Sequence, residues 1–108
     1  MGNILNAPLP PGAKGEEFRA AWSELILPAV ERFSPGLILV SAGFDAHARD
    51  PLAHLRLTEA DFAWVTGEIC AVARRVCGGR VVSMLEGGYD LDALARSVAA
   101  HVRALMDA

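Results

Sequence analysis

The sequence predicts an α/β fold whose elements follow one another as helix, strand, helix, strand, helix. Two short runs of consecutive apolar residues predict the strands, because strands buried on both faces of a parallel sheet lack polar alternation. Three longer segments with apolar residues at steps of three and four predict amphipathic helices. Since one helix lies between the two strands, we expect the strands to pair in parallel through a right-handed crossover.

The N-terminal part of the chain predicts an extended segment and then a helix. Residues 1–14 are rich in proline and glycine, so we expect an extended lead-in that ends in a turn. The apolar face of the first helix, within residues 15–33, consists of Phe18, Trp22, Leu25, Ile26, Ala29 and Phe33. Pro28 lies inside this helix and should kink or split it, because proline has no backbone N–H.

The first strand is predicted at residues 37–40, a run of leucine, isoleucine and valine that follows a Ser-Pro-Gly break. A long loop, residues 41–56, separates this strand from the second helix. Thr58 is placed to cap that helix, with Asp61 as its acidic partner in a capping-box arrangement. The buried face of the second helix is expected to carry Phe62, Val65, Ile69, Val72 and Val76.

The second strand is predicted at residues 80–85, after a Gly-Gly pair that ends the second helix. The loop of residues 86–89 follows, and Asp90 is placed to cap the last helix. The apolar face of the last helix consists of Leu91, Leu94, Val98, Val102 and Leu105. These elements account for the whole chain, which we interpret as one domain or part of one.

Composition excludes several classes of protein. Hydrophobic residues make up 53% of the 108 residues even before glycine is counted, against about 45–50% with glycine in an ordinary soluble domain. The net charge of −3 and the scattered arginines argue against nucleic-acid binding. No run of apolar residues is long enough to cross a membrane, and no signal peptide is evident. Cys70 and Cys77 are expected to be buried thiols of a cytoplasmic protein.

Chemistry is expected where the two strands end, because ligands of open α/β sheets bind at the carboxyl ends of the strands. Asp45 and Tyr89 lie five and four residues after the ends of the predicted strands and could share a site. Asp45 and His47 are both good zinc ligands, but a catalytic zinc usually takes three protein ligands. His54 is expected to be solvent-exposed and His101 to be structural, so a complete metal site is not expected within this chain.

Several motifs together resemble the zinc-dependent histone deacetylase and acetylpolyamine amidohydrolase superfamily. They are Ser-Ala-Gly-Phe-Asp-Ala-His at residues 41–47, Asp-Pro-Leu at 50–52, Leu-Thr at 57–58 and Glu-Gly-Gly-Tyr at 86–89. The last motif is similar to the class II and bacterial branch of the family. The lead-in Asn-Ala-Pro-Leu-Pro-Pro-Gly, at residues 6–12, is similar to the family segment before this region.

The resemblance implies that the chain is the C-terminal portion of an arginase/deacetylase-type parallel-sheet domain. It further implies hydrolysis of acetyl-lysine or acetylpolyamine amides with zinc as the cofactor. Asp45 matches a zinc ligand, and Tyr89 matches the catalytic tyrosine whose hydroxyl binds the substrate carbonyl. The residues that match the wall of the substrate channel are Pro51, Leu52, Gly87 and Gly88. His47 matches a position that varies in the family, so it is not assigned as a ligand.

The resemblance also shows what the chain lacks. The family supplies an Asp-x-His zinc pair and a His-His pair from earlier strands, and the resemblance places neither in this sequence. No two histidines are adjacent, and Asp45-Ala46-His47 imitates the Asp-x-His pair but aligns with the other zinc ligand. We therefore expect residues 1–108 to be a partial deacetylase domain that is inactive alone, whether it derives from a split gene, an internal start or a truncation. Zinc would bind only if another chain or the full-length protein supplied the missing ligands. The abundance of arginine and alanine suggests a bacterial source.

Two other interpretations of the sequence are kept beside this one. The chain could be a non-catalytic α/β oligomerisation or interaction module, since its apolar content exceeds what two strands and three helices can bury. Alternatively, Gly87 and Gly88 could form an ordinary turn, or an anion site at the start of the last helix, although Glu86 and Asp90 oppose an anion there. In every case the excess of apolar residues predicts self-association, or a missing N-terminal portion that covers the sheet.

Overall fold

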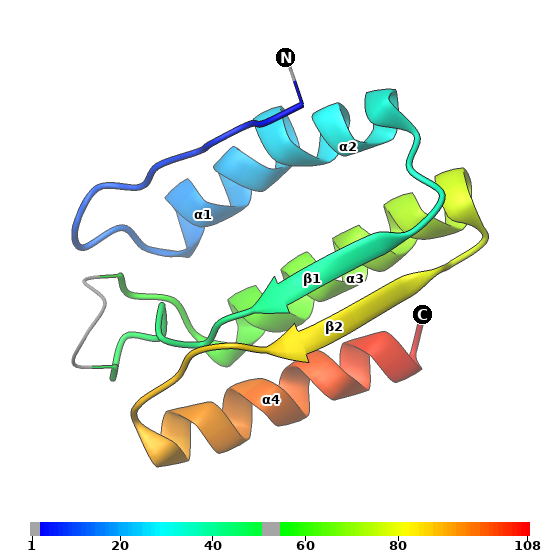
Figure 1. Cartoon of the computed structure of the whole chain (residues 1–108). Helices are drawn as coiled ribbons and strands as arrows, with labels where there is room; N and C mark the ends of the chain where they lie inside the picture. Colours follow the sequence, from blue (N-terminus) through cyan, green and yellow to red (C-terminus); the bar gives the residue numbers. More distant parts are fainter. Residues whose placement is uncertain (1–2, 51–54) are drawn as a thin grey trace.

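The computed structural model describes residues 3–50 and 55–108 (Figure 1). Its elements are α1 (Gly15–Ala21), the π-helix η1 (Trp22–Ile26), α2 (Leu27–Phe33), β1 (Ile38–Ala42), α3 (Glu59–Cys77), β2 (Val81–Leu85) and α4 (Leu91–Met106). This order confirms the predicted α/β class. Within these residues no helix is both long and apolar enough to cross a membrane.

The two strands form a parallel sheet, as predicted. The register pairs Ile38 with Val81 at one end and Ala42 with Leu85 at the other, and α3 connects the strands. Backbone pairing continues beyond the strands, because the N–H of Glu86 donates to the carbonyl oxygen of Ala42 at 2.9 Å. Both strands therefore end at the same edge of the sheet, and the loops that follow them start side by side (Figure 1).

The first helical region changes its hydrogen-bond pattern just before Pro28 but has no break there, whereas the sequence predicted a kink or a split at this residue. The N–H of Leu27 donates to the carbonyl oxygen of Trp22, five residues earlier, which is the hydrogen bond of a π-turn. Pro28 follows in the first turn of α2, where its missing N–H is tolerated. The helix thus continues in one direction past the proline while its hydrogen-bond spacing changes (Figure 1).

The ends of α3 and α4 follow the predicted caps. The N–H of Thr58 donates to the Asp61 carboxylate at 2.9 Å, and Gly78 ends α3 in a left-handed conformation with φ of 62°. At the start of α4, Asp90 Oδ1 accepts a hydrogen bond of 2.8 Å from the N–H of Ala93. These local interactions explain why the helix boundaries could be predicted within a residue or two.

The hydrophobic core lies between the helices and one face of the sheet. Its centre is Leu27 of α2 with Val65, Ile69 and Val72 of α3, and the strand residues Ile38, Val40 and Val81 pack against them. A second cluster near the strand ends contains Ala42, Phe44, Leu57 and Phe62. Cys70 and Cys77 are both buried and free, which agrees with the expected reduced thiols.

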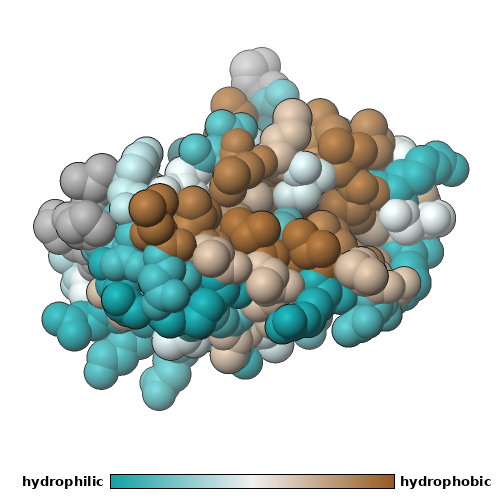
Figure 2. Space-filling model, turned by 90° about the horizontal axis from the view of Figure 1, so that it is seen from below, coloured by the Kyte–Doolittle hydropathy of each residue, from teal (hydrophilic) through white to brown (hydrophobic). Residues whose placement is uncertain are grey.

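The prediction that the strands are buried on both faces is wrong for this chain. Leu39, Val82 and Met84 are 62%, 48% and 50% exposed, and they alternate with the residues that face the core. The reason is that α3 covers only one face of the sheet, whereas no described element lies in front of the other (Figure 1). Seen from below, hydrophobic residues gather in a band across the molecule beside a hydrophilic side (Figure 2). We call the face formed by Leu39, Val82 and Met84 the open sheet face.

Candidate functional site

The two loops that leave the sheet are joined through their backbones and bring Asp45 next to Gly87. The N–H of Phe44 donates to the carbonyl oxygen of Gly87 at 2.8 Å. A Cβ atom placed on Gly87 would lie 3.2 Å from Cγ and Oδ2 of Asp45, which is closer than most carbon contacts in proteins. A side chain at this position would push against the carboxylate, so glycine permits the close approach of the two loops.

The Asp45 carboxylate is half-buried and open to a ligand. Among the residues that the structure describes, no hydrogen bond or ion pair is formed by this side chain. Its close neighbours are the backbones of Gly43 and Gly87. A carboxylate that lies beside two glycines and has no partner within residues 3–50 and 55–108 can accept a cation or a hydrogen-bond donor.

Gly88 has a backbone conformation that other residues rarely adopt. Its φ is +145°, and a Cβ atom there would lie 2.6 Å from Cδ1 of Leu94. Gly88 is therefore required both by its dihedral angle and by its contact with α4. This geometry directs the chain from β2 into α4 and sets the position of the next residue, Tyr89.

Tyr89 is held by its backbone, while its side chain is 55% exposed. Its N–H donates to Oδ2 of Asp50 at 2.7 Å. Asp50 is 7% exposed and belongs to the loop that also carries Asp45. We did not predict Asp50 as a site residue, because the contact spans 39 residues and no sequence periodicity indicates it. The structure thus brings Tyr89 and Asp45 to the same edge of the sheet through Asp50 and Gly87.

His47 is buried and both nitrogens of its ring are engaged. Nδ1 accepts a hydrogen bond of 3.1 Å from the N–H of Arg49, so Nε2 carries the proton of the neutral ring. Nε2 lies 3.0 Å from Oε2 of Glu59, the first residue of α3. In this arrangement both ring nitrogens of His47 are used by protein partners, Arg49 and Glu59.

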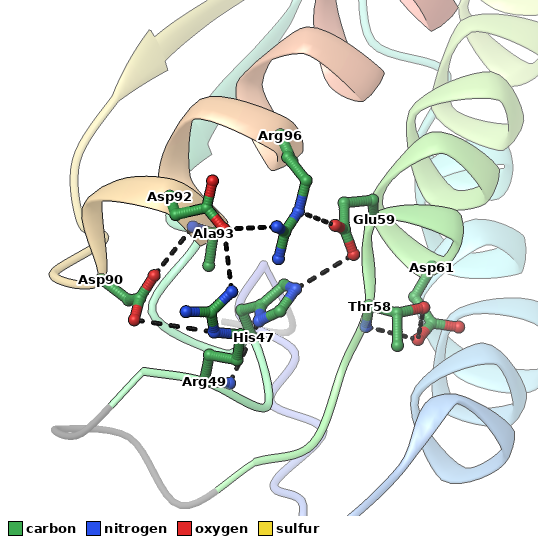
Figure 3. A network of polar contacts seen from close by, with 9 residues as sticks. All are labelled: His47, Arg49, Thr58, Glu59, Asp61, Asp90, Asp92, Ala93 and Arg96. Atoms are coloured by element: carbon green, nitrogen blue, oxygen red, sulfur yellow. Dashed lines mark hydrogen bonds and ion pairs between the residues drawn. The ribbon is translucent and has the colours of Figure 1, made fainter.

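His47 belongs to a polar cluster that joins the 44–50 loop to the starts of α3 and α4 (Figure 3). We call this cluster the loop network; its members are His47, Arg49, Glu59, Asp90, Asp92 and Arg96. Arg96 contacts both Glu59 and Asp92, and Arg49 lies 2.8 Å from Asp92 and 3.8 Å from Asp90. The network holds the loop against both helices.

The electrostatics of the loop network keep Glu59 ionised. Its pKa is lowered to about 2, first by its own backbone N–H at the start of α3 and then by hydrogen bonds from His47 and Arg96. The pKa of Arg96 is raised in return, chiefly by its hydrogen bond with Glu59. The network is therefore charged at neutral pH. Sequence analysis missed Glu59 and Arg96, since only the packing of α3 against α4 brings them together.

His101 of α4 packs its ring against Phe44 of the loop that follows β1, with the ring centroids 5.5 Å apart, and both of its ring nitrogens have hydrogen-bond partners. Its Nδ1 is 2.7 Å from Oγ1 of Thr66, which itself donates to a backbone carbonyl oxygen, and its Nε2 is 2.8 Å from Oγ of Ser83. This pattern indicates a neutral ring that donates to Thr66 and accepts from Ser83. Burial lowers the pKa of His101, which reinforces the neutral form.

Some of the predicted site lies outside the described residues. Pro51 and Leu52, which match the substrate channel, fall there, as does His54. Within residues 3–50 and 55–108, no group of three His, Cys, Asp or Glu side chains is arranged to hold a metal ion. Of the predicted zinc site, the described residues therefore contain Asp45 and no further grouping of ligands.

Comparison with known proteins gives these motifs a context. The profile of the histone deacetylase domain matches residues 1–105. Histone deacetylase 14, chloroplastic, of Arabidopsis thaliana is 49% identical over 105 residues, which cover 97% of this chain and 25% of that protein. A histone deacetylase-like amidohydrolase of Pseudomonas aeruginosa is 46% identical over 88 residues, which cover 82% of this chain and 23% of that protein.

Solved structures agree with the sequence relatives. The histone deacetylase Clr3 superimposes with a TM-score of 0.89 at 32% identity, over 98% of this chain and 17% of that chain. The HD domain of HDA15 superimposes with a TM-score of 0.80, also at 32% identity. The chain spans about a quarter of the length of the curated relatives described above. On the evidence of its motifs, its fold and these matches, the chain belongs to the histone deacetylase domain family.

Proposed function

We propose that this chain contributes Asp45 and Tyr89 to the active site of a zinc-dependent deacetylase that hydrolyses acetyl-lysine or acetylpolyamine amides. The observation that carries the proposal is the junction of the two strand-end loops, where Asp45 lies against Gly87 and Tyr89 is tied to Asp50. Both proposed functional groups thereby come to the carboxyl edge of one parallel sheet, where α/β enzymes bind their ligands.

The chemistry of Asp45 fits a metal ligand. A half-buried carboxylate that makes no hydrogen bond or ion pair within the described residues can bind zinc directly, since carboxylate oxygens are common zinc ligands. When bound, zinc would supply a Lewis acid for the amide carbonyl and an activated water for attack on it. Residues 3–50 and 55–108 offer no further ligand group, so the proposal takes the other two ligands from another chain or from the rest of the full-length protein.

We assign Tyr89 the role of hydrogen-bond donor to the substrate. Its phenol would donate to the carbonyl oxygen of the acetyl group, where negative charge develops during attack by water. Gly87 and Gly88 present backbone instead of side chains next to this position, which leaves room for an extended acyl-lysine chain. Removal of one such donor usually lowers kcat by about a hundredfold to a thousandfold.

A first experiment tests whether the chain is active alone. We expect the purified chain, supplied with zinc and an acetyl-lysine peptide, to show no turnover, since it lacks two of the three ligands. Turnover that persists through purification and disappears in Tyr89→Phe would contradict this expectation. Such a result would mean that the chain assembles a complete site, for example between two copies.

A second experiment tests the roles of Asp45 and Tyr89 where the missing ligands are present. Residues 3–108 replace the matching region of the Pseudomonas aeruginosa amidohydrolase, which is 46% identical over 88 residues. We expect the chimera to hydrolyse acetyl-lysine peptides, Tyr89→Phe to lower kcat by about a hundredfold or more, and Asp45→Asn to lose both activity and zinc. The matched control is Asp107→Asn at the exposed end of α4, which should leave both unchanged. Full activity in Tyr89→Phe would refute the proposal.

The open sheet face supports a second function, association with another protein surface. Leu39, Val82 and Met84 expose a patch of apolar side chains that a stable soluble domain normally covers. We propose that the isolated chain self-associates through this face, or pairs with the N-terminal portion of a deacetylase domain. Light scattering of the purified chain at several concentrations tests this, and a monomer at every concentration would exclude self-association.

A further inference from the structure

The contact between Asp50 and the backbone of Tyr89 indicates a role for Asp50, which the proposed function has not used so far. Asp50 is buried, yet one of its carboxylate oxygens accepts the backbone N–H of Tyr89 at 2.7 Å. We propose that Asp50 is a positioning residue, which fixes the backbone of Tyr89 and so determines where the phenol lies relative to Asp45. This inference rests on the proposed function of Tyr89.

The surroundings of Tyr89 explain why an anchor is needed. The residue before it, Gly88, has a φ of +145° that only glycine adopts readily, and the residue after it, Asp90, is the cap of α4. The Tyr89 side chain is 55% exposed, so contacts of the ring with the protein do little to hold it. The hydrogen bond to Asp50 fixes the backbone N–H of Tyr89, which lies between Gly88 and the start of α4.

Asp50 is itself held by the loop that carries Asp45. Its own N–H donates to the carbonyl oxygen of His47 at 3.0 Å, and the N–H of His47 donates to the carbonyl oxygen of Phe44 at 3.2 Å. The His47 ring is buried and bonded to Glu59. Successive turns therefore connect the segment at Asp45 to Asp50, and Asp50 connects that segment to Tyr89. A hydrogen bond to a buried carboxylate is stronger than one between neutral groups, which suits a fixed geometry.

The composition of the chain makes this contact measurable, because Tyr89 is its single tyrosine. Labelling with ¹⁵N-tyrosine gives one amide signal, and labelling with 3-fluorotyrosine gives one ring signal, both from Tyr89. In the unmodified chain we expect a downfield amide proton that exchanges slowly with solvent. In Asp50→Ala we expect that proton to move upfield and exchange about tenfold faster or more, with a changed ring signal.

Two further variants distinguish the positioning of Tyr89 by Asp50 from a general loss of order in the surrounding loop. Asp50→Asn keeps an oxygen acceptor, so it should restore the ring signal of the unmodified chain, while the loss of charge still moves the amide proton upfield. Asp90→Ala removes the neighbouring carboxylate that bonds the N–H of Ala93, so it should weaken α4 but leave both Tyr89 signals near their original values. If Asp50→Ala does not fold, Asp50→Asn carries the test through its amide shift.

The outcomes that overturn the inference are specific. An amide proton that stays in place in both Asp50 variants would mean that the carboxylate does not bind it. Equal changes in Asp90→Ala and Asp50→Ala would mean that the whole loop loosens and that Asp50 has no particular role. These signals do not depend on turnover. An active Tyr89→Phe chimera would therefore refute the proposed function and still leave the contact with Asp50 established or refuted on its own evidence.

Discussion

The two faces of the β1–β2 sheet carry the same kind of side chain in different surroundings. On one face, Ile38, Val40 and Val81 pack against buried residues of α2 and α3. On the other, Leu39 and Met84 are 62% and 50% exposed. Both faces therefore carry side chains that are apolar enough for a protein interior, but the described elements cover only one of them. The covered face should determine the stability of this chain, and the open sheet face should determine its association.

The largest effect is expected from a cavity on the covered face. Ile69 of α3 is 8% exposed in the main core cluster, so Ile69→Ala should lower the free energy of unfolding by about 2–4 kcal/mol. Leu39→Ala, on the open sheet face, should change it by less than about 0.5 kcal/mol. Urea denaturation of both variants compares the faces directly. Similar losses in the two variants would show that the open sheet face is covered in solution.

A smaller effect is expected from His101, the buried histidine that joins α3, β2 and α4 on the covered face. His101→Asn should lower the free energy of unfolding by about 1–3 kcal/mol, because Thr66 and Ser83 lose well-placed partners. Burial lowers the pKa of His101 from its usual 6.5. Its contribution to stability is therefore complete above pH 6.5 and is lost as the pH falls through the folded-state pKa, where the unfolded chain takes up the proton more readily.

The pH dependence has its own measurement and control. Denaturation of the unmodified chain at pH 7.5, 6.0 and 5.0, chosen to span about 6.5, should show falling stability. His101→Asn should remove part of that fall. A variant with the same slope as the unmodified chain would show that other groups are responsible, and that burial of His101 has little consequence for proton binding.

The loop network should make only a small contribution to stability, since the side chains of Arg49 and Arg96 are 52% and 44% exposed. Glu59 has its pKa lowered to about 2 from 4.5, so its contribution is present above pH 4.5 and is lost as the pH falls towards 2. Glu59→Gln should therefore destabilise the chain at pH 7 and have less effect at pH 3, as measured by thermal unfolding. Glu24→Gln, at an exposed position of η1, is the matched control. An effect of Glu59→Gln that does not change with pH would contradict the assigned charge.

The smallest effect on stability, and the clearest on association, is expected on the open sheet face. The double variant Leu39→Lys, Met84→Lys should keep the free energy of unfolding within about 0.5 kcal/mol of its original value. The reason is that both side chains already face solvent. The same double variant should elute later in gel filtration than the unmodified chain, since charge disfavours apolar contact. An unchanged elution volume would show that association, if present, uses another surface.

Local signals made most of the fold predictable. The positions of the helices followed from apolar spacing and from caps at Thr58 and Asp90, which act within three residues of the chain. Pro28 also acts locally, because the π-turn closed by the N–H of Leu27 lies directly before it. What failed was the burial of Leu39 and Val82. Apolar runs predict strands that need cover on both faces, and only the excess of apolar residues over the whole chain indicated that two strands and three helices do not supply it.

The positions of Asp45 and Tyr89 in the candidate site could be predicted, but the hydrogen bonds that hold them could not. Asp45 and Tyr89 could be placed at one edge of the sheet, because parallel strands end on the same side. The contacts of Asp50 with Tyr89 and of His47 with Glu59 span 39 and 12 residues, and no periodic pattern encodes them. They depend on how the loop folds back over the starts of α3 and α4, which is decided by tertiary packing.

The parallel register of β1 and β2 also has a consequence for the order of folding. Ile38 pairs with Val81, so the pairing of the two strands closes a long connection that contains the whole of α3. Such non-local pairing slows folding, because chain entropy is lost before the contacts form. The loops of Asp45 and Tyr89 begin where this pairing ends. We therefore expect the proposed active-site groups to come together only once this strand pairing has formed.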